Sequence, residues 1–123
     1  MTQDIQAAKR LILEYTAARD RALLGNETLQ VCKKYMIKEH SYRGMSPFYD
    51  LKGPEALANV VWSPLKYAMP TLQRRPDIFF SGHHSLLESA GCWVVEMGNL
   101  IGDFTDDWLK IPATGKATYL PYA

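Results

Sequence analysis

The hydrophobic residues of this chain change their spacing near Thr71. Before Thr71, apolar side chains recur every three or four residues, which is the period of an amphipathic helix. After Thr71 they alternate along the chain, which is the period of a strand with one buried face. Because the helical patterns all precede the strand patterns, the sequence predicts an α+β fold with an antiparallel sheet.

Three helices are predicted in the first part of the chain. The first covers residues 3–24, and the second begins at Asn26 and runs to about Ile37. A third opens at Gly53-Pro54, is interrupted by Pro64 and stops at Pro70. The apolar stripe of the first helix comprises Ile5, Ala8, Leu11, Ile12, Tyr15, Ala18, Ala22 and Leu23.

Three strands are predicted in the second part, over residues 71–81, 92–104 and 116–122. Pro76 makes the first an edge strand or places a bulge in it. Gly98 and Gly102 lie inside the second strand, where a sheet that curls around helices would bend. The last strand leaves an open edge, so either a partner covers it or the natural protein continues past Ala123.

Composition excludes several classes of function. The 123 residues fit one domain, and a net charge of +1 gives no basic field for nucleic acid. No apolar run is long enough to cross a bilayer and no signal peptide precedes the first helix, so we expect a cytoplasmic protein without membrane contact. Cys32 and Cys92 are then expected as reduced and buried thiols in preference to a disulfide. Because no CxxC, HExxH or Gly-rich loop occurs, we expect no metal and no cofactor.

Residues 92–104 separate by parity into two faces. One face carries Trp93, Val95, Met97, Asn99, Ile101 and Asp103, and it is the bulkier and more apolar of the two. This predicts that it faces the interior, with Asn99 pointing inward and Asp103 near the strand end. Glu96 lies on the opposite face and is predicted to be a surface charge.

Four segments in order resemble the SnoaL-like polyketide cyclase family. They are FYDLKGPEAL at 48–57, VWSPL at 61–65, MGN at 97–99 and IPATGK at 111–116. The resemblance implies a single domain over residues 1–123 with the cone-shaped barrel of the nuclear transport factor 2 (NTF2) superfamily. In such a barrel, three N-terminal helices pack against a curved antiparallel sheet. It also implies further strands after Tyr122, so the domain is expected to be truncated at its C-terminus.

The resemblance further implies binding of a small apolar carbonyl compound, with cofactor-free aldol cyclisation or isomerisation as the reaction. Such chemistry needs a base, a donor to the enolate oxygen and a pocket that shapes the substrate. Asn99 is the candidate donor, and His40 or Asp103 the candidate for moving the proton. Each has a structural alternative: Asn99 bonding a neighbouring strand, Asp103 starting a turn, and His40 bonded at a helix end.

Aromatic and sulfur side chains are the candidates for holding the ligand. At helix and strand spacing, such residues also serve as ordinary core. His83 and His84 form a conceivable metal pair without a third ligand. A non-catalytic ligand-binding or assembly domain is the alternative function, and we expect a homodimer through the outer face of the sheet. The candidate ligand-binding residues are Trp62, Tyr42, Phe48, Trp93 and Met97.

Overall fold

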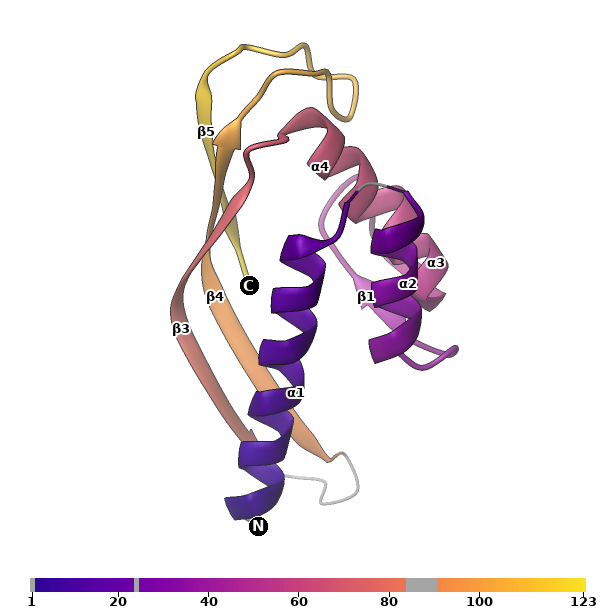
Figure 1. The fold of residues 1–123 in the computed structure, drawn as a ribbon, viewed down its shortest axis with the longest axis vertical. Coiled ribbons are helices and arrows are strands. Elements are labelled where there is room, and N and C mark those ends of the chain that lie inside the picture. The colour runs from indigo at the N-terminus through magenta and orange to yellow at the C-terminus, as the bar shows by residue number, and fades with distance from the viewer. Residues whose placement is uncertain (1, 24, 84–90) are drawn as a thin grey trace.

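A computed structural model describes residues 2–23, 25–83 and 91–123 of the chain. A long first helix lies along a curved three-stranded sheet, and the remaining helices lie beside it (Figure 1). The predicted α+β class is confirmed. The sheet is open, with β3 and β5 as its edges, and does not close into a barrel.

The helices follow the predicted order. α1 covers Thr2–Arg21 and α2 covers Asn26–Tyr35. The third helical stretch is continuous through α3 (Gly53–Ala56), the π-helical turn η1 (Leu57–Trp62) and α4 (Ser63–Ala68). Pro64 therefore does not break it, because the wider π turn before Pro64 relieves the clash between its ring and the preceding carbonyl groups.

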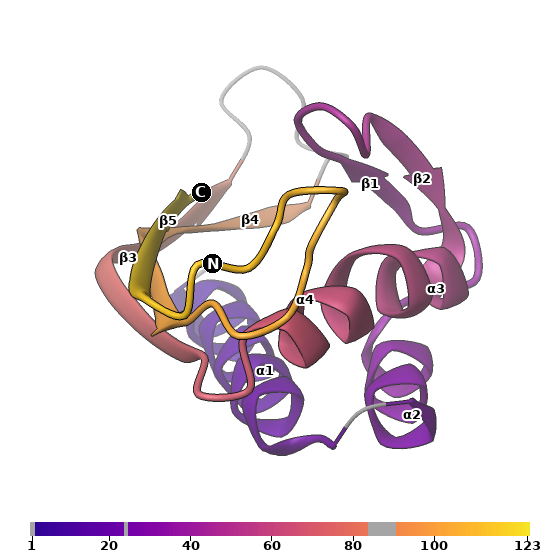
Figure 2. The ribbon, with the colours of Figure 1, turned by 90° about the horizontal axis from the view of Figure 1, so that it is seen from above.

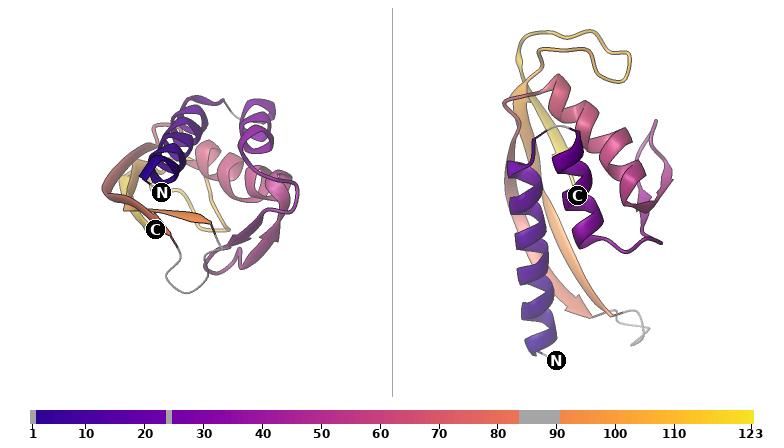
Figure 3. Two further views of the ribbon diagram at one scale, coloured as in Figure 1. Left: turned by 90° about the horizontal axis from the view of Figure 1, so that it is seen from below. Right: turned by 45° about the vertical axis from the view of Figure 1, so that its right-hand side comes forward.

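The strands form two antiparallel sheets. β1 (Ser41–Arg43) pairs with β2 (Asp50–Lys52) as a small hairpin beside α3 (Figure 3). β3 (Gln73–His83), β4 (Cys92–Asp103) and β5 (Ala117–Tyr122) form the larger sheet in the order β3-β4-β5. The register shifts between Pro76 and Ile78, and β3 is an edge strand, so both expectations for Pro76 are confirmed.

The predicted inward face of β4 is wrong. Leu100 is 8% exposed, whereas Trp93 is 54% and Met97 43% exposed on the opposite face. The residues that face the helices are Glu96, Gly98, Leu100 and Gly102, and α1 and α4 lie on that side of the sheet (Figure 2).

Glycine explains the inversion. A Cβ on Gly98 would lie 2.2 Å from the carbonyl oxygen of Arg75, and one on Gly102 would lie 3.1 Å from Cε of Met69. The inner face therefore needs small residues where other segments approach it closely. Side-chain bulk, used as the criterion for burial, selected the wrong face.

Two clusters form the core, and Trp62 packs against both. The first joins α4 to β4, and the second joins α2 to the α3–η1 stretch. Both cysteines are free; Cys32 is buried as expected, whereas Cys92 is only partly buried. Among the described residues, no helix is long and apolar enough to cross a membrane. The buried members are Leu65, Ala68, Met69, Leu100 and Phe104 in the first cluster and Cys32, Leu57, Ala58 and Val61 in the second.

Candidate functional site

A cavity of about 310 Å³ lies between the end of α1, α4 and the inner face of the sheet. This volume suits a small organic molecule. Its wall combines apolar side chains with several charged ones. The lining residues are Arg19, Asp20, Arg21, Ala22, Leu23, Trp62, Lys66, Met69, Pro70, Leu72, Arg74 and Leu100.

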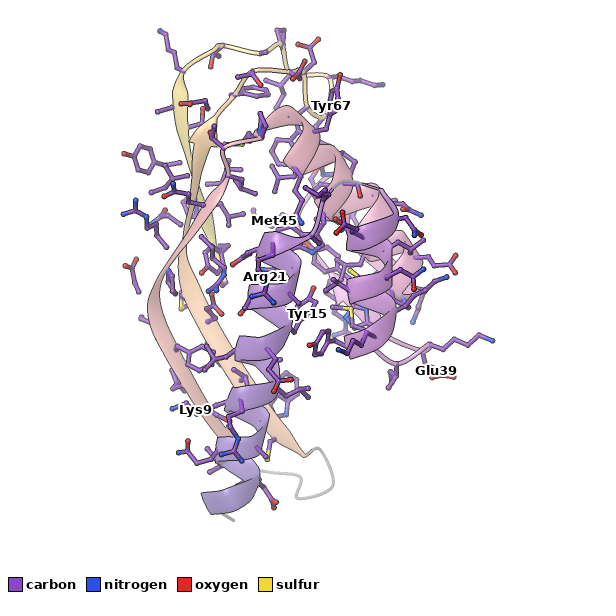
Figure 4. All side chains as sticks on the ribbon, in the orientation of Figure 1. Lys9, Tyr15, Arg21, Glu39, Met45 and Tyr67 are labelled. Atoms are coloured by element: carbon purple, nitrogen blue, oxygen red, sulfur yellow. The ribbon has the colours of Figure 1, made fainter. Side chains whose placement is uncertain are left out.

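Arg19 is the most buried charged residue of the wall, at 8% exposed. Its guanidinium lies 3.9 Å from the ring centre of Trp62 and 5.1 Å from that of Tyr15. The Tyr15 ring in turn contacts the ring of Tyr35 in α2. Lys9 lies on another side of α1 from Tyr15 (Figure 4), and its amine lies over the ring of Phe79 in the sheet. Stacking on two rings fixes the plane of the guanidinium group.

The hydrogen-bonding capacity of Arg19 is incompletely used. Its Nε is buried without a hydrogen-bond partner in the described part of the chain. Its Nη2 lies 3.8 Å from Oδ1 of Asp20, beyond hydrogen-bond distance. A buried N–H group without an acceptor is costly, so Nε of Arg19 favours an added acceptor.

The amine of Lys66 donates three hydrogen bonds to groups around it. Its Nζ donates to the carbonyl oxygen of Arg19, to that of Ala22 at 2.9 Å and to Oγ1 of Thr28 at 3.4 Å. Burial, and then the charge of Arg19, lower the pKa of Lys66. A cation at this place stabilises the C-terminal end of α1, so Lys66 supports the wall of the cavity.

Arg74 connects the cavity to a buried polar cluster on the inner face of the sheet. Its Nε donates to Oδ2 of Asp20 at 3.1 Å, and its Nη1 donates to Oε1 of Glu96 at 2.5 Å. The same Glu96 oxygen accepts the hydroxyl of Tyr122 at 2.6 Å. Burial, followed by the hydrogen bond to Glu96, raises the pKa of Tyr122 to about 12. We call Arg74, Glu96 and Tyr122 the inner polar cluster.

Glu96 is therefore not the surface charge that the sequence predicted. Its side chain is 11% exposed and that of Arg74 is 14% exposed. Arg74 is opposite Leu100 and Tyr122 is opposite Gly98. Leu100 and Gly98 share the inner face of β4 with Glu96, so the three polar side chains lie on the same side of the sheet.

The structure does not bring the three predicted catalytic residues to the cavity. Asn99 pairs with Arg75 and Pro121 on the outer face of the sheet. Asp103 is exposed, and its backbone N–H donates to Oγ1 of Thr71 at 2.8 Å. His40 lies between α2 and β1, where its carbonyl oxygen accepts from Gly53, and its Nδ1 is buried without a partner within the described residues.

The predicted ligand-binding residues divide among three places. Trp62 lines the cavity. Tyr42 and Phe48 pack against the second core cluster. Trp93 and Met97 lie on the outer face of the sheet, because the face of β4 that carries them points away from the helices. Nδ1 of His83 lies 3.6 Å from Sγ of Cys92. Its neighbour His84 lies outside the described residues, so the absence of a metal stays a prediction.

None of the charged residues of the site was predicted from the sequence, although three of them carried a signal there. Arg19 comes four residues after Tyr15, on the apolar stripe of the first helix, where a charge is unusual. Arg74 shares strand parity with Leu72. Glu96 lies on the same face of β4 as Leu100, so a correct assignment of the two faces of β4 would have placed Glu96 on the inner one.

Comparison with known proteins gives no further guide. No family model, no curated protein and no solved structure matches this chain. The resemblance to the SnoaL-like family therefore stays a prediction.

Proposed function

We propose that this chain is a small-molecule-binding domain whose cavity accepts a largely apolar carbonyl compound. The cavity itself carries the proposal. Trp62, Met69, Leu72 and Leu100 offer an apolar wall, and the charged groups near Arg19 offer donors to a carbonyl oxygen. This combination binds an apolar body and fixes the direction of its oxygen.

The curved sheet with helices on its concave side is also why we propose that the fold is an incomplete NTF2-like cone. Strands β3 and β4 bend together around α1 (Figure 1). A three-stranded open sheet leaves one side of such a cone uncovered. The SnoaL-like assignment rests on this geometry and on the four sequence segments quoted above.

Benzylacetone, an aryl alkyl ketone, tests the binding proposal. We expect it to shift the amide NMR signals of residues around the cavity. Ala22→Trp places a large ring in the cavity wall and should abolish those shifts, whereas Ala7→Trp, on an exposed part of α1, should leave them unchanged. Wild-type protein whose cavity signals do not move would overturn the proposal.

We also propose cofactor-free proton abstraction at this site. Asp20 is the carboxylate among the described cavity-lining residues, and Arg74 holds one of its oxygens at 3.1 Å. The other oxygen can accept a proton from the carbon next to the ligand carbonyl. The electron pair of that C–H bond then forms the enolate, whose negative oxygen the cationic wall stabilises. Return of the proton at another carbon gives isomerisation, and attack on a second carbonyl gives aldol closure.

Exchange of the α-protons of benzylacetone for deuterium in heavy water measures this step. We expect Asp20→Asn to slow the protein-dependent exchange by roughly a hundredfold, within the usual range for general-base catalysis. Asp50→Asn, in the exposed hairpin, is the control. Equal exchange rates in the two variants would remove Asp20 as the base and leave a binding function.

The outer face of the sheet supports a second proposal, assembly into a homodimer. Ile78, Phe80, Trp93, Met97 and Tyr119 share this face and are each between 43% and 64% exposed. We call them the outer apolar face. A second copy of the same face is a suitable partner, because two-fold related surfaces are self-complementary when both are apolar. Sedimentation as a monomer at micromolar concentration would contradict this proposal.

A further inference from the structure

We infer that the natural ligand of the cavity carries a carboxylate, and that Arg19 binds it. The inference rests on the proposed binding function and specifies its ligand class: an organic monoanion with an apolar body. Three observations support it: the net charge of the wall, the hydrogen bonds that each cationic side chain makes, and the contact between Arg19 and Trp62.

The wall has an excess of positive charge. Among the described residues that line the cavity, Arg19, Arg21, Lys66 and Arg74 are cationic and Asp20 is anionic. Glu96, which lies behind Arg74, neutralises one further cation. The space between these groups therefore favours a ligand with negative charge.

The cations differ in how far the protein satisfies them. Lys66 donates to two carbonyl oxygens and one hydroxyl, and Arg74 donates to two carboxylates. Arg19 leaves its Nε without a hydrogen-bond partner within the described residues, although its side chain is only 10% exposed. Arg19 is thus the cation for which a ligand oxygen replaces a missing partner.

The stacking geometry favours a planar anion. Cζ of Arg19 lies over the Trp62 ring, 3.9 Å from its centre, so the ring occupies a flat side of the guanidinium and not its N–H edge. Nε lies on that edge and has no partner among the described residues. A carboxylate accepts two parallel hydrogen bonds from such an edge. The apolar residues Met69, Leu72 and Leu100 then contact the rest of the ligand.

Matched pairs of acids and methyl ketones test this inference. Hydrocinnamate and benzylacetone share a phenylethyl body, and benzoate and acetophenone share a phenyl ring. In each pair the ketone has a methyl group where the acid has a charged oxygen. Titration followed by amide NMR should give an affinity for the acid at least about tenfold above that for the ketone, since a hydrogen bond to a charged group is worth about that factor.

Arg19→Gln should remove most of this preference and change the affinity for the ketone less than about threefold. Arg19→Lys keeps the charge without the planar edge and should retain only part of the preference. Arg75→Gln, an exposed arginine on the outer side of β3, is the matched control and should behave as wild type. The wild-type preference is measured without any substitution, so it decides the question even if a variant does not fold.

The outcomes separate the two proposals. If a ketone shifts the cavity signals and binds as tightly as its acid, the carboxylate inference fails and the binding function stands. If neither pair shifts those signals, both fail. Inorganic phosphate that displaces hydrocinnamate at equal concentration would overturn the choice of a carboxylate.

Discussion

The two faces of β4 have opposite relations between polarity and burial. On the inner face, Glu96 is almost enclosed and bonded to Arg74 and Tyr122. On the outer face, Trp93 and Met97 are about half exposed. In a monomeric protein, such a strand normally buries its apolar face and exposes its polar face. The inner face therefore holds a polar cluster, whereas the outer face is the one that we propose a second copy covers.

The largest expected effect on stability comes from adding a methyl group at Gly98, where the inner face of β4 lies closest to β3. In Gly98→Ala the new Cβ would lie 2.2 Å from the carbonyl oxygen of Arg75, so the backbone of β3 or β4 must move. We expect the free energy of unfolding to fall by about 3 kcal/mol, measured by urea denaturation.

Gly82→Ala is the matched control, because a Cβ on Gly82 meets no atom within 4 Å. Its free energy of unfolding should stay within about 0.5 kcal/mol of wild type. Equal stability of the two variants would show that β3 does not close over the inner face at Gly98.

Loss of the charge inside the inner polar cluster should have the next largest effect. Glu96→Gln leaves Arg74 with Asp20 as its remaining anionic partner and weakens the hydrogen bond from Tyr122. We expect a loss of about 2 kcal/mol, because the ion pair is nearly buried.

Glu55→Gln gives the comparison on the surface. Its pair with Lys33 is 3.3 Å long, with side chains 68% and 42% exposed. Such pairs contribute about 0–1 kcal/mol. If chemical denaturation shows the same change for both glutamates, the inner polar cluster does not stabilise the fold.

The outer apolar face gives a prediction about assembly. Met97→Lys introduces a charge near the centre of the face, opposite Ile78 in the register of the sheet. We expect the dimer dissociation constant, measured by sedimentation equilibrium, to rise by at least about tenfold. Ile37→Lys, an exposed apolar residue outside the sheet, should leave it unchanged. A dimer that tolerates Met97→Lys would have to use another surface.

Periodicity was sufficient to predict the elements of this fold, and insufficient to orient them. The helical stripe ending at Leu23 and the strand pattern around Ile78 predicted α1 and β3 to within a few residues. The faces of β4 could not be assigned by bulk, because Gly98 and Gly102 mark where other segments approach, and those segments are distant in the sequence.

The candidate site was predicted only in part, for a related reason. Trp62 was predicted as a pocket residue from the resemblance to the SnoaL-like family, and it does line the cavity. Arg19 and Glu96 belong to the site through tertiary contacts with Trp62 and Arg74, which local spacing does not encode. Charges on predicted apolar stripes were the available signal.

The smallest expected effect is a change in the titration of Tyr122. Burial and the Glu96 carboxylate raise the pKa of this phenol from about 10 to about 12 in the folded protein. A group whose folded pKa is raised contributes stability below its unfolded pKa. This contribution should therefore be complete below about pH 10 and lost as the pH rises toward about 12.

The difference in tyrosinate absorbance between wild type and Tyr122→Phe isolates this single phenol. In Glu96→Gln its pKa should fall only part of the way toward the ordinary value, because burial is the larger cause and persists. Ionisation of Tyr122 near its ordinary pKa in folded wild-type protein would mean that both Tyr122 and Glu96 are hydrated. The inner face would then be as open to water as the outer one, and the contrast between the two faces of β4 would lose its physical basis.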